Sequence, residues 1–266
     1  MNAQQLIEPK APTLRGQRSQ CPKDMIRLLP AVNMATPPSG PPSFTRAALD
    51  QFYADATENF ADVVPPDLSE IHLRHSRLLP NRNEILPLMP KGGVCAEVGT
   101  QTGGFAKHIL SVLQPQILHI FDLDYSLFNH AHFRLAIEQG RVQLHQGDSS
   151  CRLGALPDRS FDFIYIDGDH SYAGVTRDLA QAARKIKDGG WIVCNDYTIY
   201  SPLEKSKYGV YRAVNEFCLR QNYEILYLAL HPWGYHDVAF RKISPRQATG
   251  ALNGSREPAP SPAFPA

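Results

Sequence analysis

The stretch over residues 93–105 constrains the fold of this chain more than any other part of the sequence. Residues 94–98 form a short apolar run, long enough for one buried strand, which ends at Gly99. Two further glycines follow, and apolar residues then recur at helical spacing, at Phe105, Ile109, Val112 and Leu113. The order is therefore strand, glycine turn and helix. Such a turn lets a ligand approach the backbone closely, and the helix that follows offers free N–H groups to an anion.

The glycine spacing restricts which ligand this turn can hold. A dinucleotide-binding turn has the pattern G-x-G-x-x-G. Here Gly99 and Gly103 are four residues apart and Thr100 does not occupy a glycine position, so the pattern does not fit. An oxidoreductase on a Rossmann sheet is for this reason a disfavoured alternative. By itself, the turn is also compatible with close packing of a helix on a strand.

Strands and helices alternate along the rest of the chain. We predict strands over residues 117–121, 142–145, 161–166, 191–194, 223–230 and 237–241, and helices over residues 126–136, 175–186 and 210–218. Alternation of this kind is typical of an α/β protein with a mostly parallel sheet covered on both faces. The two adjacent strands at the end predict that one strand is antiparallel.

Acidic residues follow the predicted strands, at Glu97, Asp122, Asp148, Asp167 and Asp196. Strand ends are often polar simply because they meet water, and one or two acids would need no other reason. Ligands of open α/β sheets bind outside the carboxyl ends of the strands. An acid at or near all five strand ends therefore favours a ligand crevice along this edge of the sheet.

The chain divides into four parts by its composition. Residues 1–42 and 244–266 are rich in proline and aperiodic, and we expect both to be disordered. Residues 43–90 are interpreted as a small N-terminal helical cap, with one helix starting near Ser43 or Thr45 and a short one over residues 71–79. This cap could cover an active site or only pack on a sheet edge. Residues 91–243 carry the alternating pattern.

Composition excludes several classes of function. The 266 residues have a net charge of +1, which gives no electrostatic reason to expect nucleic acid as a partner. No apolar run approaches the ~18–20 residues of a membrane span, so no membrane contact is expected either. The basic head lacks the apolar run of a targeting peptide, and the five cysteines form no C-x-x-C pair. We therefore expect a cytoplasmic protein.

One motif is specific enough to indicate a family. The sequence Asp167-Gly168-Asp169-His170-Ser171-Tyr172, followed by Val175 and by Asp178-Leu179, resembles the signature of a bacterial methyltransferase branch. That branch includes macrolide-sugar O-methyltransferases and cephalosporin-hydroxylase-like proteins. The pattern Glu97-x-Gly99-x-x-x-Gly103 likewise resembles the first motif of class I S-adenosylmethionine-dependent methyltransferases. The match spans roughly residues 91–243 and implies a Rossmann-like class I sheet of seven strands, mostly parallel, with the last strand antiparallel.

The resemblance also implies roles for individual residues. For binding of S-adenosyl-L-methionine it implies a set along the strand ends, namely Glu97, Gly99, Thr100, Gly103, Asp122, Asp148, Ser149 and Asp167. In this set Asp122 accepts hydrogen bonds from the ribose hydroxyls, with Asp124 as a rival. A divalent metal, expected to be Mg²⁺, is implied at Asp167, Asn195 and Asp196. His170 matches the general base.

Two positions depart from the pattern of the branch. Asn195 stands where sugar-modifying relatives carry glutamate, and Ala173 stands where an acid is common. Asn195 could instead be a turn residue, and His170 could be a helix-start residue bonded to backbone.

The predicted function is Mg²⁺-assisted O-methylation of a hydroxyl on a small molecule or sugar. A non-catalytic cofactor-binding or scaffold protein is the alternative, and the sequence leaves a homo-oligomer open.

Overall fold

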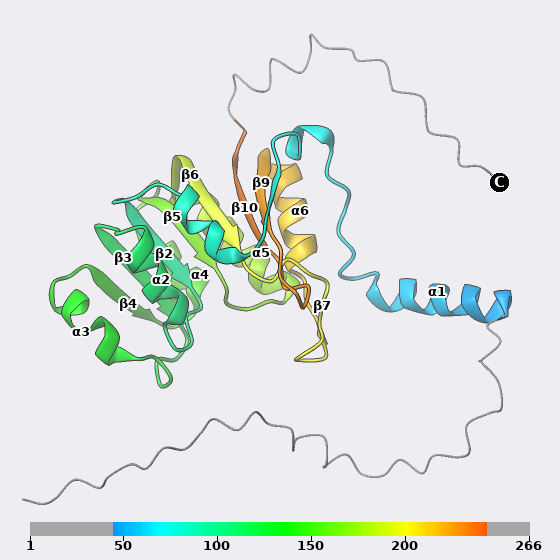
Figure 1. Ribbon diagram of the computed structural model, residues 1–266, viewed down its shortest axis with the longest axis horizontal. Coiled ribbons are helices and arrows are strands. Elements are labelled where there is room, and N and C mark those ends of the chain that lie inside the picture. The colour runs from blue at the N-terminus through cyan, green and yellow to red at the C-terminus, as the bar shows by residue number, and fades with distance from the viewer. Residues whose placement is uncertain (1–44, 244–266) are drawn as a thin grey trace, which may run out of the picture. The chain divides into compact units, whose positions relative to one another are not determined.

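The computed structural model describes residues 45–243 (Figure 1). The proline-rich head and tail that we expect to be disordered lie outside the described residues. The chain divides after Gln51, and every strand of the fold belongs to the second part. Helix α1 (Arg46–Phe60) runs across this division. Between residues 45 and 243, no helix combines the length and the apolar character needed to cross a membrane.

Eight strands of the described chain form one sheet in the order β1-β9-β10-β6-β5-β2-β3-β4. Their bounds are β1 (Arg77–Leu79), β2 (Val94–Val98), β3 (Ile117–Asp122), β4 (Val142–Gln146), β5 (Phe161–Ile166), β6 (Ile186–Cys194), β9 (Tyr223–Ala229) and β10 (Asp237–Lys242). Strand β2 pairs in parallel with β3 and β5, and β10 is antiparallel to both of its neighbours. The predicted α/β sheet, mostly parallel with an antiparallel last strand, is thereby confirmed.

The eighth strand, β1, comes from the segment that we expected to be a helical cap. The short helix predicted over residues 71–79 is wrong, because a single 3-10 turn over Glu70–His72 precedes a strand that pairs in parallel with β9. The hydroxyl of Ser76 also donates a hydrogen bond of 2.7 Å to the carbonyl of Ile225 in β9. Pairing with the free edge of β9 thus makes residues 77–79 a strand, and the periodicity of the segment alone does not predict this.

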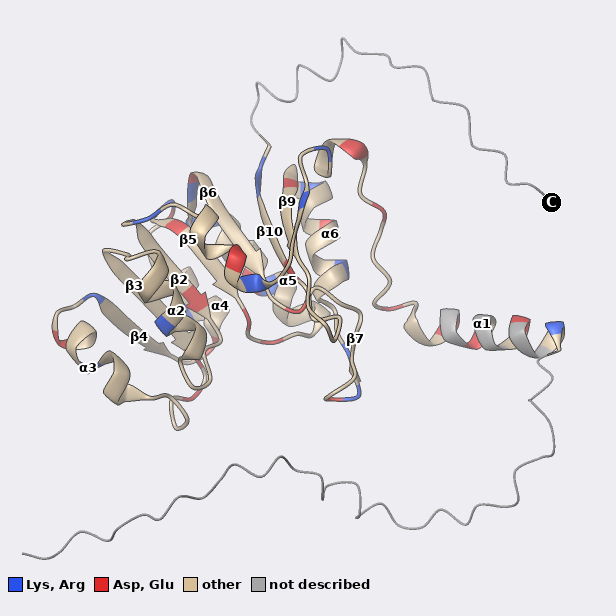
Figure 2. Cartoon of the chain, in the orientation of Figure 1, with Lys and Arg blue, Asp and Glu red and all other residues tan. Residues whose placement is uncertain are grey.

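Helices cover both faces of the sheet (Figure 1). One hydrophobic cluster includes side chains from α4 (Ser149–Gly154), α5 (Tyr172–Lys185) and α6 (Val210–Gln221), and the other includes side chains from α2 (Gly104–Val112) and α3 (His130–Glu138). Strand β5 shows the alternation, because Ile164 and Ile166 belong to the first cluster while Phe163 and Tyr165 belong to the second. Acidic and basic residues are both spread along the described chain (Figure 2).

Three elements differ from the sequence-based expectation. Helix α3 begins at His130 and not at Ser126, because the Ser126 N–H and hydroxyl bind the carboxylate of Asp124 in a tight turn. Helix α4 was not predicted. Neither was the small hairpin of β7 (Tyr200–Ser201) and β8 (Ser206–Lys207), which lies in the loop after β6.

The glycine turn after β2 packs closely against the backbone that follows β5. Gly99 has a φ of 79°, and a Cβ on it would lie 2.0 Å from the carbonyl oxygen of Asp167. Gly103, with a φ of 82°, is the N-cap of α2. Both positions require glycine, the first for space and conformation and the second for conformation and contact with two phenylalanine rings. The predicted unit of strand, glycine turn and helix is confirmed.

Candidate functional site

A cavity of about 410 Å³ lies at the carboxyl ends of β2, β3, β4 and β5, where ligands of open α/β sheets bind. Most of the residues predicted to bind the cofactor line it, namely Gly99, Thr100, Asp122, Asp148, Ser149 and Asp167. Glu97 and Gly103 are not among its lining residues. A larger hollow of about 830 Å³ lies elsewhere, near Asn222 and Arg241, and none of the predicted site residues lines it.

The carboxylate of Asp122 holds the glycine turn in place. Its Oδ2 accepts hydrogen bonds from the backbone N–H groups of Thr100 at 2.9 Å and Gln101 at 3.0 Å. Oδ1 accepts a third hydrogen bond, from Asp124 N–H at 3.2 Å, and its second lone pair leaves room for a hydroxyl donor of a ligand. The rival candidate, Asp124, does not line the cavity, and its carboxylate is engaged by Ser126.

Glu97 is a buried carboxyl group at the end of β2. Its side chain is 1% exposed and its Oε2 has no hydrogen-bond partner, and the nearby Thr100 Oγ1 also lacks one. Burial, with the charges of Asp167 and Asp122 acting in the same direction, raises the pKa of Glu97 to about 8. A buried oxygen without a partner is costly unless a ligand supplies a donor. The cationic amino group at the methionine end of S-adenosyl-L-methionine would be such a donor, so this feature fits the cofactor.

The far wall of the cavity is formed by the start of α4. Asp148 is the N-cap of this helix, and its Oδ1 accepts hydrogen bonds from Cys151 N–H and the Ser150 hydroxyl, which lower its pKa to about 2. The Ser149 hydroxyl donates to Asp178 Oδ1 at 2.6 Å. Burial raises the pKa of Asp178 to about 6.

Several lining residues were not predicted from the sequence, among them Gln101, Arg177 and Asp178. Asp178 belongs to the motif that carries the family resemblance, so a signal for it was present. Gln101 and Arg177 lie in no motif that would have identified them.

A second cavity, of about 330 Å³, lies beside the first at the carboxyl end of β6. Its lining residues include His170, Asn195, Asp196, Tyr208 and Tyr235. The loop after β6 contributes Tyr208 to this lining, and the turn between β9 and β10 contributes Tyr235. The Tyr235 hydroxyl contacts Ser201 Oγ at 2.7 Å, which fixes the ring. Trp233, in the same turn as Tyr235, does not line the cavity and is 62% exposed.

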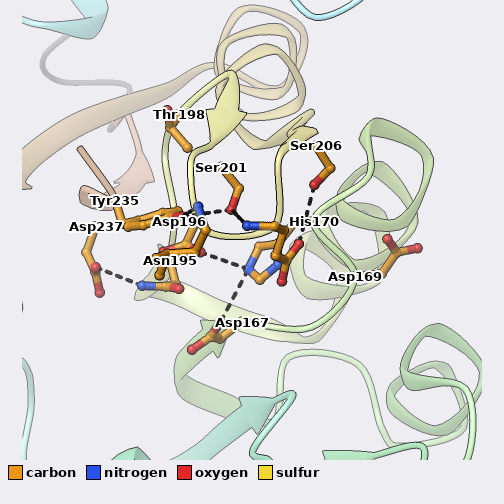
Figure 3. Close-up of polar contacts among 12 residues, drawn as sticks. Asp167, Asp169, His170, Asn195, Asp196, Thr198, Ser201, Ser206, Tyr235 and Asp237 are labelled. Atoms are coloured by element: carbon orange, nitrogen blue, oxygen red, sulfur yellow. Dashed lines mark hydrogen bonds and ion pairs between the residues drawn. The ribbon is translucent and has the colours of Figure 1, made fainter. Parts of the chain in front are cut away.

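His170 lies between two carboxylates. Its Nε2 is 3.3 Å from Asp167 Oδ1 and 3.6 Å from Asp196 Oδ2 (Figure 3). Its ring stacks on Tyr208 with centroids 4.6 Å apart. Burial lowers the pKa of His170, but the contact with Asp167 and the charges of Asp167 and Asp196 outweigh burial, so the net shift is upward. An imidazole in this position can take a proton, and the two carboxylates would stabilise the resulting cation.

One of the three predicted metal ligands, Asn195, belongs to a group of hydrogen-bonded polar side chains. It donates through Nδ2 to Asp237 Oδ1 at 3.0 Å (Figure 3), and Asp237 Oδ2 accepts from the Tyr165 hydroxyl at 2.7 Å. Both Asn195 and Asp237 are buried, so Asn195 belongs to this hydrogen-bonded group. Within the described residues, no cluster of three or more His, Cys, Asp or Glu side chains could hold a metal ion. The expectation of Mg²⁺ is therefore not supported by the arrangement of these side chains.

Comparison with known proteins supports the resemblance inferred from the motifs. Residues 96–197 match the family model described as a methyltransferase domain. The matched segment runs from β2 through β6, and so contains the glycine turn and most of the lining of the first cavity. No curated protein sequence matches the chain.

Several solved structures have a similar fold. The pyocyanin biosynthetic protein PhzM is 18% identical, with a TM-score of 0.48 over 60% of this chain and 54% of its own. The tRNA methyltransferase TrmK of Bacillus subtilis is 13% identical, with a TM-score of 0.47 over 64% and 68%. An O-methyltransferase family protein of Burkholderia thailandensis is 10% identical, with a TM-score of 0.48 over 61% and 55%. The chain thus spans about half the length of the first and the third.

Proposed function

We propose that this chain, a class I S-adenosylmethionine-dependent methyltransferase, methylates a hydroxyl group of a small molecule or sugar with His170 as the general base. The observation that carries the proposal is the contact between Asp167 Oδ1 and His170 Nε2 at 3.3 Å. Asp167 lines the first cavity and His170 lines the second. A methyl donor in the first cavity and an acceptor in the second would meet beside this contact.

The first cavity supplies groups suited to the methyl donor. The carboxylate of Asp122 can accept a hydrogen bond from a ribose hydroxyl, and the unpartnered Oε2 of Glu97 can pair with an amino group. Asp148 and Ser149 lie at the opposite wall, where we assign the adenine. When bound, the donor provides an electrophilic methyl group on a sulfonium sulfur. The protein then has to hold the two reactants in line and take up the proton of the acceptor hydroxyl.

His170 accepts that proton in the proposed reaction. Its neutral imidazole takes the proton of the acceptor hydroxyl at Nε2 while the new carbon–oxygen bond forms and the carbon–sulfur bond of the donor breaks. Asp167 and Asp196 stabilise the imidazolium because both carboxylates lie within 3.6 Å of Nε2. We assign no step to Mg²⁺, since no cluster of three or more His, Cys, Asp or Glu side chains among the described residues could hold a metal ion.

The shape of the second cavity supports a small acceptor. A volume of about 330 Å³ suits a compact molecule, and the lining groups that can hydrogen-bond are mostly acceptors or hydroxyls, at Asp196, Ser201, Glu204, Tyr208 and Tyr235. An acceptor with several hydroxyl groups would satisfy them. The near-neutral charge of the chain gives no separate reason to prefer RNA.

The proposal is tested in two stages. S-adenosylhomocysteine should raise the melting temperature of the full chain, and transfer of a labelled methyl group should then be measured against a panel of hydroxyl compounds and sugars. The variant His170→Ala should lose transfer, whereas His132→Ala, a matched change at an exposed histidine of α3, should retain it. Binding of S-adenosylhomocysteine without transfer to any hydroxyl would favour the non-catalytic alternative. Equal transfer by both variants would remove His170 as the base.

A further inference from the structure

Arg82 brings a guanidinium group into the second cavity from outside the segment that matches the methyltransferase model. It belongs to the 3-10 turn over Arg82–Glu84, which the Asn81 side chain caps by accepting a hydrogen bond from Asn83 N–H at 2.9 Å. The residues that follow the turn, Ile85 and Leu86, are buried. A short, capped turn anchored by buried apolar residues therefore positions Arg82.

Aromatic rings hold the guanidinium in place. Arg82 Cζ lies 4.9 Å from the centroid of the Phe105 ring, and that ring packs against Tyr165 with centroids 4.1 Å apart. Tyr165 is fully buried and donates its hydroxyl hydrogen bond to Asp237 at 2.7 Å. Stacking on an aromatic ring suits the flat, delocalised cation of arginine. The Arg82 side chain thus packs on a rigid pair of aromatic rings, the second of which is hydrogen-bonded to the buried carboxyl group of Asp237.

The surroundings of Arg82 are rich in carboxyl groups. Asp196, Glu204 and Asp237 line the same cavity, and among all the lining residues Arg82 is the one lysine or arginine. Arginine keeps its charge at any ordinary pH, whatever the protonation state of these carboxyl groups. Arg82 is therefore the permanent positive charge among these acids.

We propose that Arg82 is the resident cation of the second cavity and occupies the electrostatic role that a divalent metal would otherwise take among these carboxyl groups. This inference rests on the proposed function in that it concerns the same acceptor site. It accounts for the concentration of carboxyl groups in a cavity that a single lysine or arginine lines. The site then needs no divalent ion to balance its charge, and removal of Arg82 should leave carboxylates able to attract one.

Binding of Mn²⁺ to the full chain tests this role, because the ion is read directly by electron paramagnetic resonance without a known acceptor. We expect no saturable site in the wild-type chain at up to about 1 mM Mn²⁺, the weak end of protein affinities for divalent cations. The variants Arg82→Ala and Arg82→Gln should each bind Mn²⁺ at least about tenfold more tightly than the wild type, because the opposing charge is gone. Arg82→Lys should behave like the wild type, since it keeps a positive charge.

Two controls make the result specific. Arg77→Ala removes an exposed arginine of β1 in the same segment and should leave Mn²⁺ binding unchanged. Asp196→Asn combined with Arg82→Ala should abolish the new site. Saturable Mn²⁺ binding by the wild type that Asp196→Asn removes would overturn the proposal, and so would Arg82 variants that bind no better than the wild type. Binding of S-adenosylhomocysteine is measured on the same samples. Because it tests the proposed function independently of Mn²⁺ binding, a failure of the role of Arg82 can be told from a failure of the proposed function.

Discussion

His170 Nε2 lies 3.3 Å from Asp167 Oδ1, and this contact connects the two cavities of the site. The turn that carries His170 is fixed by two hydrogen bonds, because Asp169 Oδ1 accepts from Ser171 N–H at 2.9 Å and Gly209 N–H donates to the His170 carbonyl at 2.8 Å. The imidazole is thus held by its backbone, by its stacking on Tyr208 and by two carboxylates. A base held in this way needs little reorganisation to act.

Replacement of His170 by alanine should lower turnover by about 10²–10⁴, the usual effect of losing a general base. Affinity for S-adenosylhomocysteine should stay the same, because His170 lines the second cavity and not the first. Calorimetry and steady-state kinetics check the two halves of this prediction. Turnover within twofold of the wild type would show that the acceptor hydroxyl loses its proton by another route.

The pH dependence of turnover should report the carboxylates around His170. A base must be neutral, so the rate should fall as the pH drops below the pKa of His170, which is raised above the ordinary histidine value of 6.5. Asp196→Asn removes one of the charges that raise this pKa, so the acidic limb should move to lower pH. An acidic limb that stays in place in Asp196→Asn, measured as kcat against pH, would assign the limb to another group.

Local patterns in the sequence were sufficient to predict the sheet. The apolar run of β5 and the acid that follows it at Asp167 belong to one short segment, and both are found where expected. The contacts between side chains in the candidate site could not be predicted in the same way. Asn195 lies beside Asp196 in sequence, yet its side chain bonds to Asp237, which is 42 residues away. A motif gives residue identity and spacing, but such a partner depends on how β6 and β10 pair in the sheet.

The N-terminal segment shows the same limit more strongly. Strand β1 exists because the edge of β9 pairs with it, and Arg82 reaches the second cavity because the turn after β1 places it there. The position of β9 cannot be predicted from the residue spacing or the hydrophobic periodicity within residues 70–90. The boundaries at residues 43, 90 and 243 stay predictions.

Asp122→Ala should weaken binding of S-adenosylhomocysteine by about 1–3 kcal/mol, the scale of a lost hydrogen bond to a charged group. Part of this loss should come from the protein itself, because Asp122 also holds the N–H groups of Thr100 and Gln101 in the glycine turn. Asp124→Ala is the matched control, since Asp124 does not line the cavity. Calorimetry on both variants checks the assignment, and a larger loss in Asp124→Ala would move the ribose contact there.

Glu97 should release a proton when S-adenosylhomocysteine binds. In the free protein its pKa is raised to about 8, so the carboxyl group is mostly protonated near neutral pH. An ammonium group placed against the unpartnered Oε2 would favour the charged form and lower that pKa. Binding at about pH 7 should therefore release close to one proton, and affinity should rise as the pH increases toward the pKa of the free form.

Calorimetry in buffers of different ionisation enthalpy measures the protons released by this step. The variant Glu97→Gln keeps the size of the side chain and cannot ionise, so it should release close to one proton fewer than the wild type. This comparison also subtracts the titration of the ligand's own amino group, which lies in a similar range of about 7.7–8.0 for α-amino groups. Above about pH 9.5 the difference between the two proteins should disappear, because Glu97 is already ionised. Equal proton release by wild type and Glu97→Gln near neutral pH would show that the ammonium group binds elsewhere.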